Sequence, residues 1–121
     1  MARYVDGFVI CVPKKNINAY KKMAVLGGKV WMDQGALEYM ECVGKDLKGM
    51  DGCGNFLKLV KAKKEETVVF SWIVYKSKAH RDAVNKKVMA DKRMNSFSGP
   101  MPFKLINMSY GGFEAIVDKR K

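Results

Sequence analysis

Hydrophobic and polar residues follow two different periods along the chain, and these periods separate expected strands from expected helices. Runs rich in β-branched and aromatic residues at 4–12, 36–44, 67–75 and 105–117 predict four strands. Apolar residues spaced three and four positions apart predict amphipathic helices over 16–34 and 78–90. Residues 45–65 contain Gly49, Gly52 and Gly54 and predict an irregular connection, with a short helix at 55–62.

Several local features refine these elements. Gly27 and Gly28 interrupt the first helix, where each glycine costs about 1 kcal/mol relative to alanine, so close packing or a kink is expected there. Gly35 predicts the end of that helix, and Ser77 is expected to cap the second one. A Gly111-Gly112 pair predicts a bulge or bend in the last strand. The buried stripe of the second helix is expected to comprise Ala79, Ala83, Val84 and Val88.

The order β-α-β, long connection, β-α-β predicts an α+β fold of the ferredoxin-like type. Such a fold has a four-stranded antiparallel sheet with both helices on one face. The third strand carries mostly apolar residues on both faces: Val68, Phe70, Trp72 and Val74 alternate with Val69, Ser71, Ile73 and Tyr75. Two helices shield only one face, and exposure of the other would leave an unusually large apolar patch. We therefore expect a second copy to pack there as a two-fold homodimer.

Length and composition are consistent with this interpretation. A chain of 121 residues that is 48% hydrophobic predicts one domain spanning residues 1–121. The early apolar run, residues 8–12, stops at Pro13, far short of a membrane span or a signal peptide, so we expect no membrane association. Cys11, Cys42 and Cys53 are odd in number and lack metal-ligand spacing, which favours a reducing, cytoplasmic location.

The net charge of +11 raises the alternative of a polyanionic partner such as nucleic acid. The lysines are, however, scattered over the expected helix surfaces, loops and the final DKRK segment at 118–121. Such scattering is typical of a solvated surface. The third strand also lacks the aromatic motif by which RNA-binding domains of similar topology stack bases. Nucleic-acid binding is therefore the least favoured alternative.

Carboxylates on the expected strands are the strongest candidates for a functional site, because a charged group on a sheet face requires a partner, water or a ligand. Strand parity groups Asp6 with Tyr4 and Phe8, Glu41 with Tyr39, and Glu114 with Tyr110. If these groups converge, Glu41 or Asp6 would act as a base or hydrogen-bond anchor. The candidate pocket comprises Asp6, Glu41, Trp72, Tyr110 and Glu114. The alternative is that these carboxylates, and Glu38 with them, are paired or solvated at strand ends.

Other constellations favour structural roles. His80 is the only histidine, which argues against a metal site, and we expect a capping or packing role for it. Arg81 and Asp82 are expected to form surface or interface ion pairs. The GMDGCGN segment at 49–55 lacks the ending of a phosphate-binding loop. No feature of the sequence calls for a cofactor.

Three segments resemble the DUF1428 family of small bacterial proteins: YVDGFV near the start, the long block at 66–94, and MPF followed by YGGFE within 101–114. The resemblance implies a dimeric α+β barrel of ferredoxin-like protomers. The wider superfamily includes antibiotic-biosynthesis monooxygenases, muconolactone isomerases and stress-response barrel proteins. His80, Lys92 and Lys104 depart from the family's usual residues, which argues against a shared catalytic role for His80.

These observations leave three functional hypotheses. The first is a dimeric barrel with a small-molecule pocket between sheet and helices, which either binds a metabolite or performs cofactor-free chemistry of the monooxygenase or isomerase type. The second is a purely structural or interaction dimer without catalysis, and the third is an RNA-binding protein. The sequence predicts a fold and an assembly, but it identifies no reaction.

Overall fold

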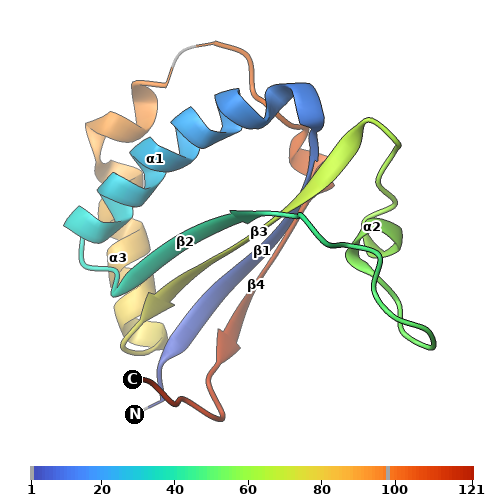
Figure 1. The fold of residues 1–121 in the computed structure, drawn as a ribbon. Coiled ribbons are helices and arrows are strands. Elements are labelled where there is room, and N and C mark those ends of the chain that lie inside the picture. Colours follow the sequence, from blue (N-terminus) through green and yellow to red (C-terminus); the bar gives the residue numbers. More distant parts are fainter. Residues whose placement is uncertain (1, 98) are drawn as a thin grey trace.

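A computed structural model describes residues 2–97 and 99–121 of the chain. Four strands, β1 (Tyr4–Pro13), β2 (Glu38–Val43), β3 (Glu66–Tyr75) and β4 (Met108–Glu114), alternate with two long helices, α1 (Ile17–Asp33) and α3 (Lys78–Ala90). A single helical turn, α2 (Phe56–Leu59), lies in the connection between β2 and β3. The predicted α+β fold, with its strands and two main helices, is therefore confirmed (Figure 1).

The four strands form one antiparallel sheet in the order β2-β3-β1-β4. The central strands β1 and β3 pair along their whole lengths, from Tyr4 opposite Tyr75 to Pro13 opposite Glu66. β4 pairs with β1 in an uninterrupted register in which Gly111 lies opposite Gly7. The predicted bulge at Gly111-Gly112 is therefore wrong: these glycines continue the ladder instead of breaking it.

Both long helices cover the same face of the sheet, and the hydrophobic core lies between them and that face (Figure 1). β1 and β3 supply their inward residues to this core in alternation, as the pleat requires. The core is formed by two clusters, one around Ile10, Val12, Tyr20, Ala24, Val69 and Phe103, and the other around Val30, Ala36, Ile73, Tyr75, Val84 and Val88.

The helices begin and end largely where local sequence signals place them. α1 ends at Asp33, and Gly35 then adopts a φ of +116°, which side-chain-bearing residues rarely tolerate. The Ser77 side chain accepts a hydrogen bond from the backbone N–H of His80 and caps α3 as predicted.

The inner face of α3 is more polar than the sequence pattern predicted. Ala79 and Ala83 are exposed, so their assignment to the buried stripe is wrong, whereas Val84 and Val88 are buried as predicted. The positions beside the two valines belong to Arg81 and Asn85, whose polar side chains form hydrogen bonds with the hydroxyls of Tyr110 and Tyr75, respectively. A count of apolar residues alone misses such positions.

The opposite face of the sheet is apolar and is not covered by α1 or α3. By register it contains Val5, Gly7, Val9 and Cys11 of β1 with Val68, Phe70, Trp72 and Val74 of β3, flanked by Met40, Cys42 and Phe113. α2 covers part of this face through a contact between the rings of Phe56 and Phe70, whose centroids are 5.8 Å apart. Phe113 remains 63% exposed, and Met40 and Phe70 remain 44% and 42% exposed. We refer to this surface as the uncovered face.

Candidate functional site

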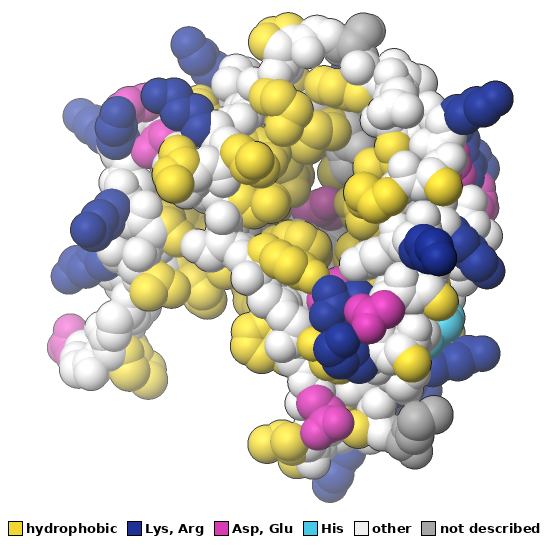
Figure 2. Space-filling model, turned by 180° about the vertical axis from the view of Figure 1, so that it is seen from behind, with side chains coloured by type: hydrophobic (Ala, Val, Ile, Leu, Met, Phe, Trp, Pro, Cys, Tyr) yellow, Lys and Arg dark blue, Asp and Glu magenta, His cyan; other side chains and the backbone are white. Residues whose placement is uncertain are grey.

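A hollow lies on the covered side of the sheet, between the strands and α1. Its volume is about 210 Å³. Hydrophobic residues of β1, α1, β3, β4 and the segment between α3 and β4 form most of its lining, including Phe8, Ile10, Met23, Trp31, Ile73, Met94, Phe103 and Met108. We call it the inner cavity. Figure 2 shows a hollow with hydrophobic walls and an acidic side chain visible inside it. Glu41 of β2 is the acidic residue among those lining the inner cavity.

Two tyrosine hydroxyls hold the carboxylate of Glu41. The Tyr20 hydroxyl, from α1, donates to Oε1 at 2.7 Å, and the Tyr39 hydroxyl, from β2, donates to Oε2 at 2.7 Å. Each carboxylate oxygen thus accepts one hydrogen bond from a neutral donor and retains a lone pair for another. The three side chains come from a helix and a strand, so the packing of α1 against the sheet determines their geometry.

Gly27 and Gly28 explain how Tyr39 reaches this position. A Cβ atom added at Gly28 would lie 3.0 Å from the Tyr39 ring, and one at Gly27 would lie 3.1 Å from the Tyr39 hydroxyl. The absence of side chains on one turn of α1 therefore leaves the space that the tyrosine ring occupies. The close packing predicted for this glycine pair is confirmed, and it serves the Glu41 site.

The protonation of the two tyrosines agrees with their role as donors. Burial, and then the negative charge of Glu41, raise the pKa of Tyr20 and the pKa of Tyr39 well above the usual value for a phenol. Both hydroxyls therefore keep their protons at neutral pH and continue to donate to the carboxylate.

A second hollow lies on the outer side of the same three residues. It measures about 540 Å³, runs between α1 and the edge strand β2, and includes Lys21, Val25, Lys29, Met32 and Val43 in its lining. Tyr20, Ala24, Tyr39 and Glu41 line both this outer groove and the inner cavity. The Glu41 site thus lies at the boundary between an open groove and a more apolar interior.

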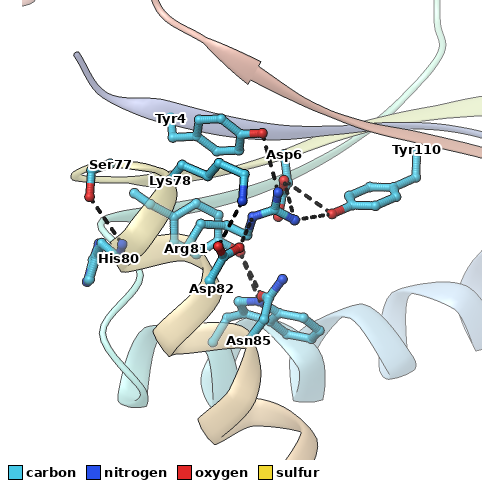
Figure 3. A network of polar contacts seen from close by, with 11 residues as sticks. Tyr4, Asp6, Ser77, Lys78, His80, Arg81, Asp82, Asn85 and Tyr110 are labelled. Carbon is cyan, nitrogen blue, oxygen red and sulfur yellow. Dashed lines mark hydrogen bonds and ion pairs between the residues drawn. The ribbon is translucent and has the colours of Figure 1, made fainter. Parts of the chain in front are cut away.

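Asp6, a second candidate carboxylate on this face, has a different environment. It is 1% exposed, and Oδ1 lies 3.6 Å from Nη1 of Arg81 on α3 and 3.4 Å from the Tyr110 hydroxyl, which donates to it. The Arg81 guanidinium donates to the Tyr110 hydroxyl at 2.6 Å and to the Tyr4 hydroxyl at 3.3 Å. Figure 3 shows these side chains directed toward one another between β1, β4 and α3.

Burial dominates the electrostatics of Asp6. Desolvation raises its pKa above the ordinary value of 3.8, and the opposing attraction of Arg81 does not cancel that effect. The charge of Arg81 is further compensated by Asp82, whose Oδ1 lies 3.1 Å from Nε. Arg81 was expected to form a surface or interface ion pair. Its link to Asp82 has that character, but the same guanidinium also reaches a buried carboxylate.

Of the remaining candidate residues, Tyr110 joins Asp6, whereas Trp72 and Glu114 do not converge with either carboxylate. The indole of Trp72 belongs to the uncovered face, where its N–H donates to Glu38 Oε2 at 2.6 Å, although Trp72 also contributes to the lining of the inner cavity from within β3. Tyr110 stacks on Phe8 with ring centroids 5.0 Å apart and is 50% exposed. Glu114 is exposed at the end of β4.

Glu41 and Asp6 share a face, yet they are separated by one intervening strand. Glu41 lies opposite Ser71, whereas Asp6 lies opposite Ile73. With strands about 4.8 Å apart and a rise of about 3.3 Å per residue, the two-residue offset puts their backbones roughly 12 Å from each other. The candidate pocket therefore divides into a Glu41 site and an Asp6 network. Tyr20 was not among the candidate residues, and its proximity to Glu41 arises from the packing of α1 against the sheet.

His80 has the packing role expected of it. Its Nδ1 accepts a hydrogen bond from the backbone N–H of Lys76 at 2.9 Å, and its ring packs edge-on against Tyr75. Across residues 2–97 and 99–121, no three His, Cys, Asp or Glu side chains gather as a metal site would require. Within the same residues, no helix has the length and apolar character needed to cross a membrane.

Comparison with known proteins places this architecture in a family. Residues 3–105 match the model of DUF1428, described as a protein of unknown function. The chain is 47% identical over 118 residues to the uncharacterized protein YbaA of Escherichia coli strain K12, covering 97% of this chain and 99% of that protein. The same identity and coverage hold for YbaA of Shigella flexneri. The chain therefore belongs to the DUF1428 family.

Proposed function

We propose that the protein binds a small, largely apolar metabolite in the inner cavity, with Glu41 as the polar anchor. The observation that carries this proposal is the carboxylate held by Tyr20 and Tyr39 at the edge of an otherwise hydrophobic cavity. Binding sites for small molecules typically combine apolar walls with a few oriented polar groups. The two tyrosines orient the carboxylate before any ligand arrives, which reduces the cost of ordering it on binding.

Glu41 is also the residue best placed for chemistry. A carboxylate beside an apolar cavity can accept a proton from a bound molecule, as in isomerisation next to a carbonyl, without any cofactor. This chemistry belongs to the first of the three hypotheses, a cofactor-free enzyme of the monooxygenase or isomerase type. Asp6 is less suitable as a base because it is enclosed by Arg81, Tyr110 and Tyr4.

We further propose that two ferredoxin-like protomers pair through their uncovered faces to form a dimeric α/β barrel. Strand register assigns two charged residues to this face, Glu38 and Glu66, and both are acidic, so two copies of a chain with net charge +11 could approach there without bringing basic side chains of the strands together. Phe70, Trp72 and Phe113 supply the aromatic surface typical of the centre of an interface.

The free thiols of Cys11, Cys42 and Cys53 fit a reducing cytoplasm.

A ligand screen tests the binding proposal. Metabolites of several chemical classes are added to the purified protein, and the melting temperature is measured for the wild type and for Glu41→Gln. Binding to the folded state raises the melting temperature, and the rise grows with the logarithm of the ratio of ligand concentration to Kd. A ligand that stabilises the wild type but not Glu41→Gln supports the proposal, and the absence of stabilisation by every class would refute it.

Sedimentation velocity tests the dimer. The wild type should sediment with twice the mass of one chain at micromolar concentration. Phe113→Glu should shift it to a monomer, because it introduces a charge into the proposed interface at an exposed apolar position. Met89→Glu, at an exposed position of α3, provides the matched control and should leave the dimer intact. A wild-type monomer would contradict the assembly but not the cavity, since one protomer supplies all of the cavity's lining described above.

A structural or interaction dimer without a ligand is the second candidate function. The apolar character of the uncovered face is the observation that favours it, because that face accounts for dimerisation without requiring any site. A dimer in the sedimentation experiment together with a negative ligand screen would support this second candidate function. RNA binding is less well supported because the lysines are scattered along the chain and do not form a single cluster. A gel shift that is negative at low salt would exclude it.

A further inference from the structure

We propose that the ligand of the inner cavity is a single-ring aromatic molecule that carries a hydrogen-bond donor and no negative charge, such as a phenol or an aromatic amine. This inference rests on the proposed function, since it specifies the chemical class that the Glu41 site would select. Three properties of the cavity support it: its volume, the composition of its walls, and the polarity of its single anchor.

The volume limits the size of the ligand. The inner cavity measures about 210 Å³. An apolar cavity of about 150 Å³ in another protein accommodates benzene, so this one has room for one ring and a small substituent. Larger molecules would have to extend past Tyr20 and Tyr39 into the outer groove, which shares the residues of the Glu41 site.

The walls favour a flat aromatic guest. Phe8, Trp31 and Phe103 present aromatic surfaces, and aromatic pairs gain energy from stacked or edge-on contacts beyond the burial of area. Met23, Met94 and Met108 complete the lining with flexible thioethers, which contact aromatic rings favourably and adapt to irregular shapes. A ring is therefore better matched to this cavity than a polar chain of similar volume.

The anchor determines the polarity of the ligand. Tyr20 and Tyr39 already donate to Glu41, so the remaining lone pairs of the carboxylate can only accept a further hydrogen bond from a donor on the ligand. Among the described residues that line the inner cavity, none is Lys or Arg, and Lys21 and Lys29 line only the outer groove. A carboxylate on the ligand would thus face Glu41 without a compensating cation, at a large cost.

Three ring compounds of similar size test the inference on the wild-type protein. Phenol carries a donor, toluene carries none, and benzoate carries a negative charge; their dissociation constants are measured by ligand-observed NMR titration. Phenol should bind about tenfold more tightly than toluene, as expected for one additional hydrogen bond to a carboxylate, and benzoate should bind more weakly than both. Equal affinities for phenol and toluene, or benzoate as the tightest ligand, would overturn the inference.

Substitutions test whether the difference in affinity between phenol and toluene arises in the inner cavity. Glu41→Gln should reduce the affinity for phenol about tenfold and leave toluene nearly unchanged, because only the donor contact weakens. Met23→Trp fills the inner cavity and should abolish binding of both rings, whereas Met89→Trp, at an exposed site on α3, should not. Circular dichroism verifies that each variant is folded. If Glu41→Gln does not fold, the affinities of the wild type for the three ring compounds and the comparison of Met23→Trp with Met89→Trp still test the inference.

The two proposals fail in different ways. If toluene and phenol bind equally and Met23→Trp blocks both, the cavity binds ligands but does not select a donor, so only the inference fails. If no ring binds and the metabolite screen is also negative, the cavity is not a ligand site and the proposed function fails with the inference.

Discussion

Glu41 and Asp6 are both carboxylates on the covered face of one sheet, yet their partners give them different capacities. Glu41 is held by two neutral hydroxyls and borders a cavity, so its oxygens remain available to a further donor. Asp6 is 1% exposed, and Arg81, Tyr110 and Tyr4 enclose it, so a ligand has no comparable access. A buried charged side chain is therefore not enough to identify a ligand-binding site. A carboxylate that still has free lone pairs and borders an open cavity is the better indication.

The two carboxylates should also differ in their contribution to stability. Asp6 and Arg81 connect β1 to α3, far apart in sequence, and removal of one partner leaves the other charge poorly compensated. Glu41 joins α1 to β2 through hydrogen bonds that neutral groups donate. We therefore expect the Asp6 network to be mainly structural and the Glu41 site to be mainly functional.

The largest effect is expected at Arg81. Arg81→Met leaves Asp6 buried without its cation and should lower the free energy of unfolding by about 3 kcal/mol, measured by urea denaturation. Arg93→Met is the matched control, because Arg93 pairs with Asp33 and Asp91 near the surface and its loss should matter much less. Equal losses in the two variants would show that Asp6 does not depend on Arg81.

A smaller effect is expected at the tyrosines of the Glu41 site. Tyr39→Phe removes one donor to the carboxylate and should lower the free energy of unfolding by about 1.5 kcal/mol. The same substitution in a Glu41→Gln background should cost less, because the hydrogen bond to a charged acceptor is already gone. A double-mutant cycle measures this coupling, and strictly additive losses would mean that the tyrosine does not act through Glu41.

The smallest effect is a change of stability with pH at Asp6. Its folded-state pKa is raised above 3.8, so the stability that it contributes is fully present below that pH and is lost as the pH rises through the folded-state value. Asp6→Asn does not titrate. The stability of the wild type relative to Asp6→Asn should therefore fall as the pH rises from about 4 through the folded-state pKa of Asp6. A rise over this range, measured by urea denaturation, would show that the attraction of Arg81 outweighs desolvation.

The sequence anticipated half of the candidate site. Strand parity correctly placed Tyr39 beside Glu41 and Tyr4 beside Asp6, because side chains two residues apart share a sheet face. It could not pair Glu41 with Tyr20 or Asp6 with Arg81, since those contacts depend on how each helix is rotated and placed on the sheet. Trp72 was expected to wall the pocket, but its indole lies with Glu38 on the other face because its parity differs from that of Glu41.

Hydrophobic periodicity by itself determined the four strands, the two long helices and the two-sided apolar character of β3, because a period of two or of 3.6 residues is a property of neighbouring positions. Tertiary structure alone decided that Gly27 and Gly28 would admit the Tyr39 ring and that the inner face of α3 would present Arg81 and Asn85. Those outcomes depend on contacts between residues distant in the chain, which no local pattern encodes. The cavity at Glu41 is such an outcome.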